Sequence, residues 1–161
     1  MNLERLNVAN IELYIDAPID YVFKCLDDDA IIVKWNSFLI ENIYETPDDY
    51  LYPKPGMKFQ SVQRFGKKQY TFDAEMTAYN SPYHVGLKVS TKEGISFTDY
   101  YLERAGSHTK LIVELSTIPS NWWQRTLTKL FGWAAKGMYQ EEYEKLKEYV
   151  EETYDWEQDI E

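Results

Sequence analysis

Apolar and polar residues alternate near the start of the chain and then change to helical spacing. Residues 11–15 place an apolar side chain at every second position, which predicts a β-strand with one buried face. In residues 19–26 the apolar side chains lie three or four positions apart, which is typical of one face of a short helix. Pro18 suits the first turn of that helix, and Asp16 is its expected N-cap. The three aspartates that follow are expected to cap a second short helix, which ends at Trp35.

The middle of the chain has the pattern of six short strands joined by turns. The expected strands cover residues 38–44, 58–65, 68–79, 84–90, 95–103 and 109–118. The segment 45–56 contains three prolines and is expected to form a flexible flap beside the sheet. The apolar side chains that share one face of the third strand are Tyr70, Phe72, Ala74, Met76 and Ala78. This period of two predicts an antiparallel sheet with one covered and one solvated face.

A long helix is expected from Trp122 to about Tyr154, with Asn121 as its N-cap. Its expected inward stripe consists of Phe131, Ala135, Met138, Tyr139, Leu146, Tyr149 and Val150. Gly132 and Gly137 weaken the first half of this helix, and a bend is expected there.

Composition narrows the class of protein. The chain has 161 residues, of which 44% are hydrophobic and 16% aromatic, so a single globular domain spanning 1–161 is expected. The net charge of −10 is concentrated in an acidic end, residues 140–161, which carries ten carboxylates and two lysines. No basic stripe is present, which argues against nucleic acid as a partner. The single cysteine, Cys25, and the absence of an apolar leader favour the cytoplasm.

Three short motifs resemble those of a known superfamily. The first is the opening Ala17-Pro18 with Val22-Phe23 and Asp27, and the second is the glycine-containing segment 55–59. The third is the hairpin formed by residues 101–104 and 108–111, although Arg104 and His108 replace the proline and glycine that are common there. In order and spacing these motifs resemble the SRPBCC superfamily, the helix-grip domains that include START, Bet v 1-like and polyketide cyclase-like proteins.

The resemblance implies an α+β helix-grip fold. In that fold a curved, antiparallel, seven-stranded sheet wraps around a long C-terminal helix, and two short helices follow the first strand. It also implies a cavity between sheet and helix, with no cofactor or metal. The residues expected to line this cavity are Trp35, Phe38, Tyr70, Phe72, Met76, Thr98, Tyr100, Leu102, Val113, Phe131, Ala135, Met138 and Tyr139. Ordinary core packing is the alternative interpretation of these side chains.

Few residues suit catalysis. His84 and His108 are far apart and lie in no zinc-binding motif. The candidate catalytic residues are Asp99 and Tyr100, of which Tyr100 is expected to face the cavity. Asp99 is out of phase with it, so only a one-residue shift in register would make Asp99 a buried carboxylate with a raised pKa and a candidate general base.

Residues 122–137 combine three tryptophans with three cations and no acid. One interpretation places Trp122, Trp123 and Trp133 at the mouth of the cavity, with the cations in water. Transient contact with an anionic membrane is a second interpretation, and ordinary packing is a third.

Three functions remain open from the sequence. The first is binding or transport of a hydrophobic small molecule, such as a lipid, a polyketide or an aromatic metabolite. The second is a cyclase or dehydratase type of reaction in the same cavity. The third is a protein-interaction module similar to the chaperone activators of the superfamily, in which the acidic end contacts a protein partner.

Overall fold

The computed structural model describes residues 4–158. Its elements in chain order are β1 (Leu6–Ile15), α1 (Ile19–Asp27), α2 (Asp29–Trp35), β2 (Leu39–Tyr44), α3 (Pro47–Leu51), β3 (Lys58–Phe65), β4 (Lys68–Asn80), β5 (His84–Thr91), β6 (Gly94–Ala105), β7 (His108–Pro119) and α4 (Trp122–Thr153). The order expected from the sequence is therefore confirmed, with one helix added.

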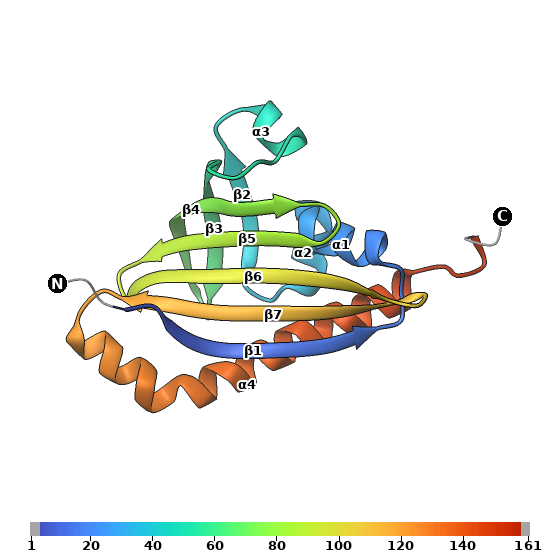
Figure 1. The fold of residues 1–161 in the computed structure, drawn as a ribbon. Helices are drawn as coiled ribbons and strands as arrows, with labels where there is room; N and C mark the ends of the chain where they lie inside the picture. The colour runs from blue at the N-terminus through green and yellow to red at the C-terminus, as the bar shows by residue number, and fades with distance from the viewer. Residues whose placement is uncertain (1–3, 159–161) are drawn as a thin grey trace.

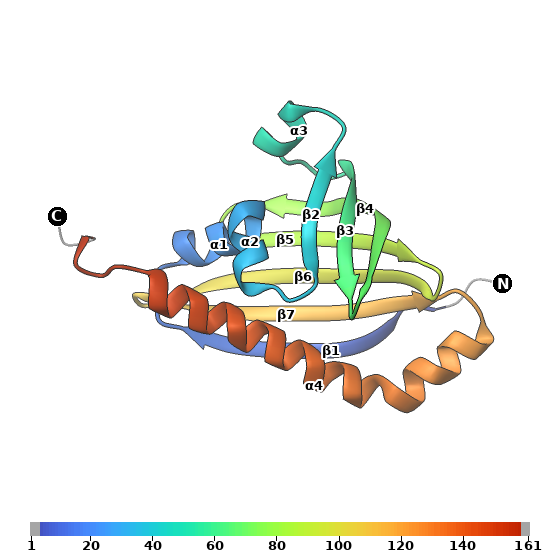
Figure 2. The same ribbon diagram turned by 180° about the vertical axis from the view of Figure 1, so that it is seen from behind.

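The strands form one seven-stranded sheet in the order β1-β7-β6-β5-β4-β3-β2, and each neighbouring pair is antiparallel. The sheet is strongly curved, so that β2, β3 and the start of β4 run across the direction of β6, β7 and β1, whereas the second half of β4 runs alongside β5 (Figure 1). Seen from behind, α4 crosses the inner side of the sheet, and α1 and α2 lie beside its C-terminal half (Figure 2). This arrangement confirms the helix-grip fold.

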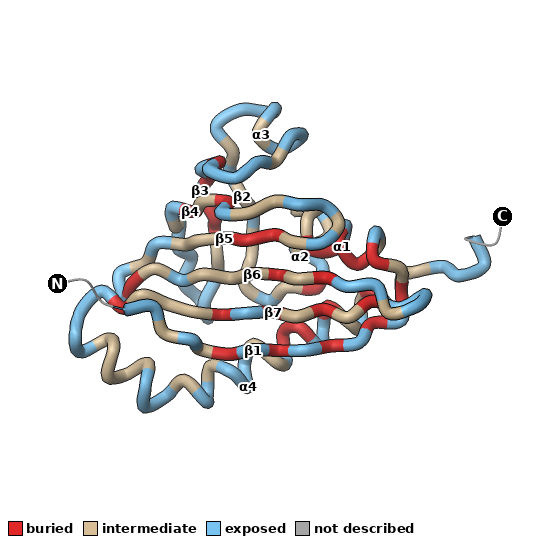
Figure 3. Tube along the Cα trace, in the orientation of Figure 1, coloured by how far each residue is buried: buried red, intermediate tan, exposed pale blue. Residues whose placement is uncertain are grey.

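The core lies between the sheet and the second half of α4. Ile11 of β1, Val113 of β7 and Leu146 and Val150 of α4 belong to one buried cluster, and all four side chains are at most 1% exposed. The buried stretches concentrate at this end of the molecule (Figure 3). Burial of such aliphatic side chains contributes roughly 1.5–3 kcal/mol each to folding, so this end of the fold is the better anchored one.

Register fixes which side chains face α4. On β6, Tyr100 pairs with Val85 and Val113, and all three are buried on the inner side. On β4, a register irregularity between Met76 and Ala78 shifts the phase by one residue. The prediction that Ala78 shares a face with Met76 is therefore wrong, because an extra residue in one strand reverses the alternation that follows it.

The aspartates at the junction of α1 and α2 connect this junction to the sheet through hydrogen bonds. Asp28 caps α2 by accepting a hydrogen bond from the N–H of Ala30, as predicted. Asp27 accepts a hydrogen bond from the Tyr79 hydroxyl at 2.8 Å, and Asp29 accepts one from the Tyr44 hydroxyl at 2.7 Å. The run of three aspartates thus holds the two short helices against β4 and β2.

Two local predictions are corrected. Asp16 does not cap α1, because Pro18 occupies the N-cap position and its side chain has no hydrogen-bonding atom. Asp16 instead pairs with Nδ1 of His108 at 2.8 Å. The segment expected to be a flap contains the short helix α3, whose N-cap Thr46 accepts a hydrogen bond from the N–H of Asp49. Proline at the first helical position favours such a start.

The two halves of α4 differ in burial. Asn121 caps the helix as predicted, and all of its buried residues lie in the second half: Glu142, Tyr143, Leu146 and Val150. The first half diverges from the sheet beyond β1 (Figures 1 and 2). No helix in residues 4–158 is long and apolar enough to cross a membrane.

Candidate functional site

Four aromatic side chains cluster where the β3–β4 hairpin meets the start of β2. Phe65 lies between Phe38 and Phe72, with ring centroids 5.3 Å and 6.4 Å away. Tyr70 and Phe72, two residues apart on β4, stack at 5.9 Å with an interplanar angle of 8°. Their phase is that of the buried Met76, so they belong to the inner side of the sheet. We call these four residues the aromatic cluster; Phe65 and Tyr70 remain exposed.

Three tyrosines meet further along the inner side. The hydroxyls of Tyr100 and Tyr143 are 3.0 Å apart and buried, and the Tyr139 phenol lies close to both. Burial raises the pKa of Tyr100 to about 12, and burial together with the Tyr100 phenol raises the pKa of Tyr143 well above its usual value. Burial also raises the pKa of Tyr139. All three phenols are therefore neutral at physiological pH and can donate a hydrogen bond.

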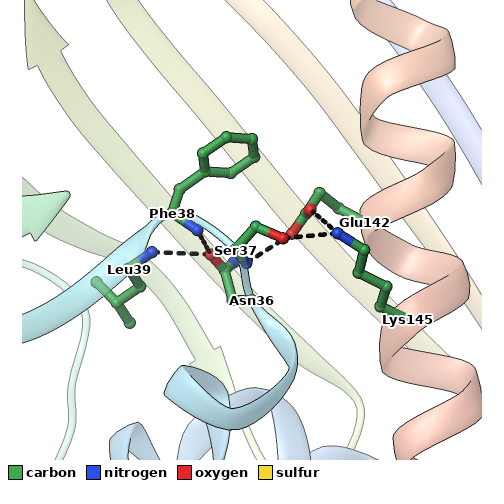
Figure 4. A network of polar contacts seen from close by, with 6 residues as sticks. All are labelled: Asn36, Ser37, Phe38, Leu39, Glu142 and Lys145. Atoms are coloured by element: carbon green, nitrogen blue, oxygen red, sulfur yellow. Dashed lines mark hydrogen bonds and ion pairs between the residues drawn. The ribbon is translucent and has the colours of Figure 1, made fainter. Parts of the chain in front are cut away.

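A polar network connects α4 to the loop before β2 (Figure 4). Glu142 accepts the Ser37 N–H at 2.9 Å and pairs with Lys145 at 3.0 Å, and the Lys145 ammonium also donates to the Ser37 hydroxyl at 2.7 Å. Asn36 accepts the N–H of Phe38 at 2.8 Å. Burial would raise the pKa of Glu142, but the hydrogen bonds from Ser37 and Lys145 outweigh it, so the pKa lies below its usual value. The network thus fixes the backbone at Phe38, which belongs to the aromatic cluster.

The residues expected to line a cavity divide into three groups. Buried in the packed core are Trp35, Met76, Tyr100, Leu102 and Val113. Half-buried are Phe38, Phe72, Thr98, Ala135 and Tyr139. Exposed are Tyr70, Phe131 and Met138. The first group matches the core-packing interpretation; the other two groups, together with Phe65, form a partly exposed apolar surface that we call the inner surface.

Of the α4 members of the inner surface, Ala135 and Tyr139 are turned toward the sheet, and Phe131 and Met138 lie on one flank of the helix. Relative to the buried Leu146, Ala135 and Tyr139 lie about 20° around an ideal helix, and Phe131 and Met138 lie about 60–80° around it. Met138 is one turn before Glu142, whose carboxylate reaches the loop next to Phe38. The helix thus presents apolar side chains on the side from which the aromatic cluster projects.

Asp99 lies outside this surface. It occupies the outer face of β6, where its carboxylate is 2.9 Å from Nε2 of His84 and 3.5 Å from the Arg5 guanidinium. The shifted register that would bury Asp99 inside is excluded, because Tyr100 holds the inner position. Asp99 is therefore not a general base of the inner surface. The His84 ring stacks on Tyr101, its cross-strand partner, at 4.3 Å.

Comparison with known proteins agrees with this geometry. Residues 16–151 match the family described as Activator of Hsp90 ATPase homolog 1-like protein. The chain belongs to this family. The resemblance to the SRPBCC superfamily is confirmed by this match and by the structural similarities that follow. No curated protein matches the sequence significantly.

Several solved structures share the fold of this family member. Ara h 8.0201 superposes with a TM-score of 0.66 at 13% identity, over 91% of this chain and 98% of that chain. TTHA0849 from Thermus thermophilus superposes with a TM-score of 0.68 at 12% identity, over 94% of this chain and 100% of that chain. MLL2253 from Mesorhizobium loti superposes with a TM-score of 0.65 at 17% identity, over 91% of this chain and 100% of that chain. At such identities the similarity shows the fold alone.

The tryptophans expected at a cavity mouth lie elsewhere on this family member. Trp122, Trp123 and Trp133 are 70%, 59% and 75% exposed. They lie about 120–140° around the helix from Leu146, which turns them away from the sheet. Their apolar character alone did not reveal this orientation, because the first half of α4 is apolar around much of its circumference.

The acidic end is not uniformly solvated. Glu142 is 5% exposed and pairs with Lys145. Nothing in the sequence indicated this burial other than the position of Glu142 beside Tyr143. The inward stripe expected from the sequence did not include Tyr143, although this residue lies four positions after Tyr139 and three before Leu146.

Two hollows in residues 4–158 are separate from the inner surface. One, of about 310 Å³, is lined by Glu45, Asp49, Lys54, Pro55, Gly56, Met57 and Lys58. The other, of about 380 Å³, is lined by Glu144, Lys147, Glu148, Glu151 and Glu152. Within the same residues, no three His, Cys, Asp or Glu side chains are grouped so that they could hold a metal ion.

Proposed function

We propose that this protein binds a hydrophobic small molecule on the inner surface, between the sheet and the adjoining part of α4. The observation that carries the proposal is the exposure of apolar side chains on the inner side of a fold whose other end is fully packed. Tyr70, Phe131 and Met138 are each more than 40% exposed there. A ligand that covers them removes apolar area from water, which contributes about 25 cal/mol per Å².

Tyr139 supplies a polar group for orienting such a ligand. Its side chain is half-buried, and no group in residues 4–158 forms a hydrogen bond with its hydroxyl, which keeps access to water. A ligand oxygen that accepts a hydrogen bond from this hydroxyl replaces water there, and the pairing fixes the orientation of the ligand. The class that fits is an apolar molecule with one carbonyl or hydroxyl group, which includes lipids, polyketides and aromatic metabolites.

Titration with the hydrophobic dye anilinonaphthalene sulfonate tests the location. Tyr70→Ser is expected to weaken dye binding about tenfold, which corresponds to the loss of about 1.4 kcal/mol of apolar contact. Tyr14→Ser is the matched control, because Tyr14 is also a half-exposed strand tyrosine but lies on the outer side of β1. Trp133→Ser should leave the affinity unchanged. Equal affinity of Tyr70→Ser and Tyr14→Ser would reject the proposed location.

A reaction of the cyclase or dehydratase type would have to use the phenols as proton donors. The inner positions of β6 are occupied by Ser96, Thr98, Tyr100 and Leu102, and none of these side chains is a base at physiological pH. With Asp99 on the outer face, the geometry supports binding better than catalysis.

Interaction with a protein partner is the second candidate function, favoured by the family match. The exposed carboxylates of Glu144, Glu148 and Glu152 on one side of α4 are the surface for it. Deletion of the helix from residue 141 would remove the buried Leu146 and Val150, so charge reversal is the appropriate test. Lys substitutions at the three glutamates should abolish capture of a partner without a change in Tm; capture that persists would reject this role.

We place either activity in the cytoplasm. The support is the sequence argument together with Cys25, a free thiol that is buried in the core. Burial raises the pKa of this thiol to about 11, so it stays protonated and has little tendency to react.

A further inference from the structure

The first half of α4 carries an exposed apolar face that the proposed binding site does not use. Trp122, Trp123, Leu130 and Trp133 are 59–75% exposed, and we call them the outer tryptophan face. Leu130 lies about 160° around the helix from the buried Leu146, opposite the side that approaches the sheet. Water-exposed tryptophans are unfavourable on a surface that meets only solvent.

Cations border this face on one flank. Arg125, Lys129 and Lys136 lie about 60–100° around the helix from Leu146, on the flank opposite Phe131 and Met138. Residues 122–139 contain no Asp or Glu, so this part of the helix has a net charge of +3 within a protein of net charge −10. Glu4 is the one carboxylate that the described structure pairs with these cations, 3.8 Å from Arg125.

We propose that the outer tryptophan face rests on the surface of an anionic phospholipid bilayer. Tryptophan rings favour the interface between headgroups and acyl chains, and cations beside them attract anionic headgroups. The arrangement is that of an amphipathic helix that lies on a membrane, and α4 is not apolar enough to cross one. A protein partner would fit the aromatic side chains, but it offers no comparable reason for a uniformly cationic flank.

The rest of α4 limits the contact to this half. The same outer side of the helix carries Glu141, Glu144, Glu148 and Glu152 after residue 140. Glu141, the nearest of these carboxylates, is about 12 Å along the helix from Trp133 and Glu148 is about 22 Å from it, both beyond the screening length of about 8 Å at physiological ionic strength. The carboxylates therefore do not cancel the local attraction, and they keep the second half of the helix away from an anionic surface.

Membrane contact goes beyond the binding of a ligand and involves different residues. Since the outer tryptophan face and the inner surface occupy opposite sides of the same helical segment, a hydrophobic ligand would have a short path between bilayer and protein. Membrane contact can be measured without any ligand, so its failure and that of the proposed function are distinguishable.

Co-sedimentation with vesicles tests the proposal. The full chain is expected to bind vesicles of phosphatidylcholine with phosphatidylglycerol at least about tenfold more tightly than vesicles of phosphatidylcholine alone, with binding weakened by salt. Trp123→Ser combined with Trp133→Ser should reduce binding to the anionic vesicles by about tenfold or more. The matched control is Leu51→Ser with Tyr52→Ser, which removes two side chains of similar exposure near α3.

The charge requirement has its own pair of variants. Lys129→Glu with Lys136→Glu should lower binding to anionic vesicles by at least about tenfold, whereas Lys67→Glu with Lys92→Glu, in turns of the sheet, should not. The native Tm of each variant verifies folding, since all of these side chains are exposed. Equal loss in test and control pairs, or no binding by the unmodified protein, would overturn the proposal. So would a tryptophan-dependent dimer, measured by sedimentation velocity, in place of vesicle binding.

Discussion

Hydrogen bonds between single side chains determine which tyrosine hydroxyls on the inner side of the sheet already have a partner. The hydroxyls of Tyr100 and Tyr143 form a hydrogen bond with each other, whereas the hydroxyl of Tyr139 beside them has no such partner in residues 4–158 and is the group that we propose for a ligand. The inward position of Tyr100 followed from the alternation along β6, which any buried sheet face imposes. The burial of Glu142 did not follow, because it depends on Ser37, 105 residues away in the chain. No local pattern contains such a long-range contact.

The buried phenols make stability sensitive to high pH. Tyr100 has a folded pKa of about 12, above the value of about 10 for an unfolded chain. Its contribution to stability is therefore complete below about pH 10 and is lost as the pH rises toward 12. Urea unfolding between pH 8 and 12 should show this fall, and Tyr100→Phe should reduce its steepness. A fall of the same steepness in both proteins would contradict the assignment.

Glu142 should contribute to stability far more than its neighbour. Glu142→Gln removes the charge that holds Ser37 and Lys145 and is expected to lower the free energy of unfolding by about 1–3 kcal/mol. Glu141→Gln, at an exposed position, should change it by less than about 0.5 kcal/mol. Because the pKa of Glu142 is lowered, its contribution is present at neutral pH and lost as the pH falls through its folded value. Denaturant titration of both variants, at neutral and acidic pH, measures the difference.

At the scale of elements, α4 combines a packed half with a half that is free of the core. Its length and its N-cap were predictable from Asn121 and from continuous helical spacing. Which side of its first half faces the sheet was not predictable, since apolar residues there occur on nearly all sides. The orientation is imposed from the second half, where Leu146 and Val150 are buried against the sheet.

Two glycines in the free half should be replaceable with a gain in stability. A Cβ added at Gly132 or Gly137 would meet no atom within 4 Å. Alanine at each position is therefore expected to stabilise the helix by up to about 1 kcal/mol and to raise Tm by about 2–4 °C. Gly94→Ala is the contrasting control, because φ is +147° there and the added Cβ would approach Pro119 Cα to 2.9 Å. Calorimetry that shows no gain for the α4 variants would contradict a continuous, unobstructed helix.

In the molecule as a whole, the sheet and α4 pack closely against each other at one end only, where the second half of the helix is buried. The order of elements along the chain and the helix-grip fold were predictable, because three motifs and the alternation of apolar residues all point to the same arrangement. The sequence did not predict which part of the inner side belongs to the packed core and which part stays exposed. This division depends on the angle at which α4 leaves the sheet, which packing between distant residues determines.

Native mass spectrometry of the freshly purified protein, followed by organic extraction of any bound compound, tests ligand binding most directly. We expect a stoichiometric apolar adduct on the wild-type protein and on the outer-side variant Tyr14→Ser, with much lower occupancy on Tyr70→Ser and Tyr139→Phe. An adduct of equal occupancy on all four proteins would show that the inner surface is not the binding site. Wild-type protein without an adduct that also fails to bind the hydrophobic dye would contradict the proposed function itself.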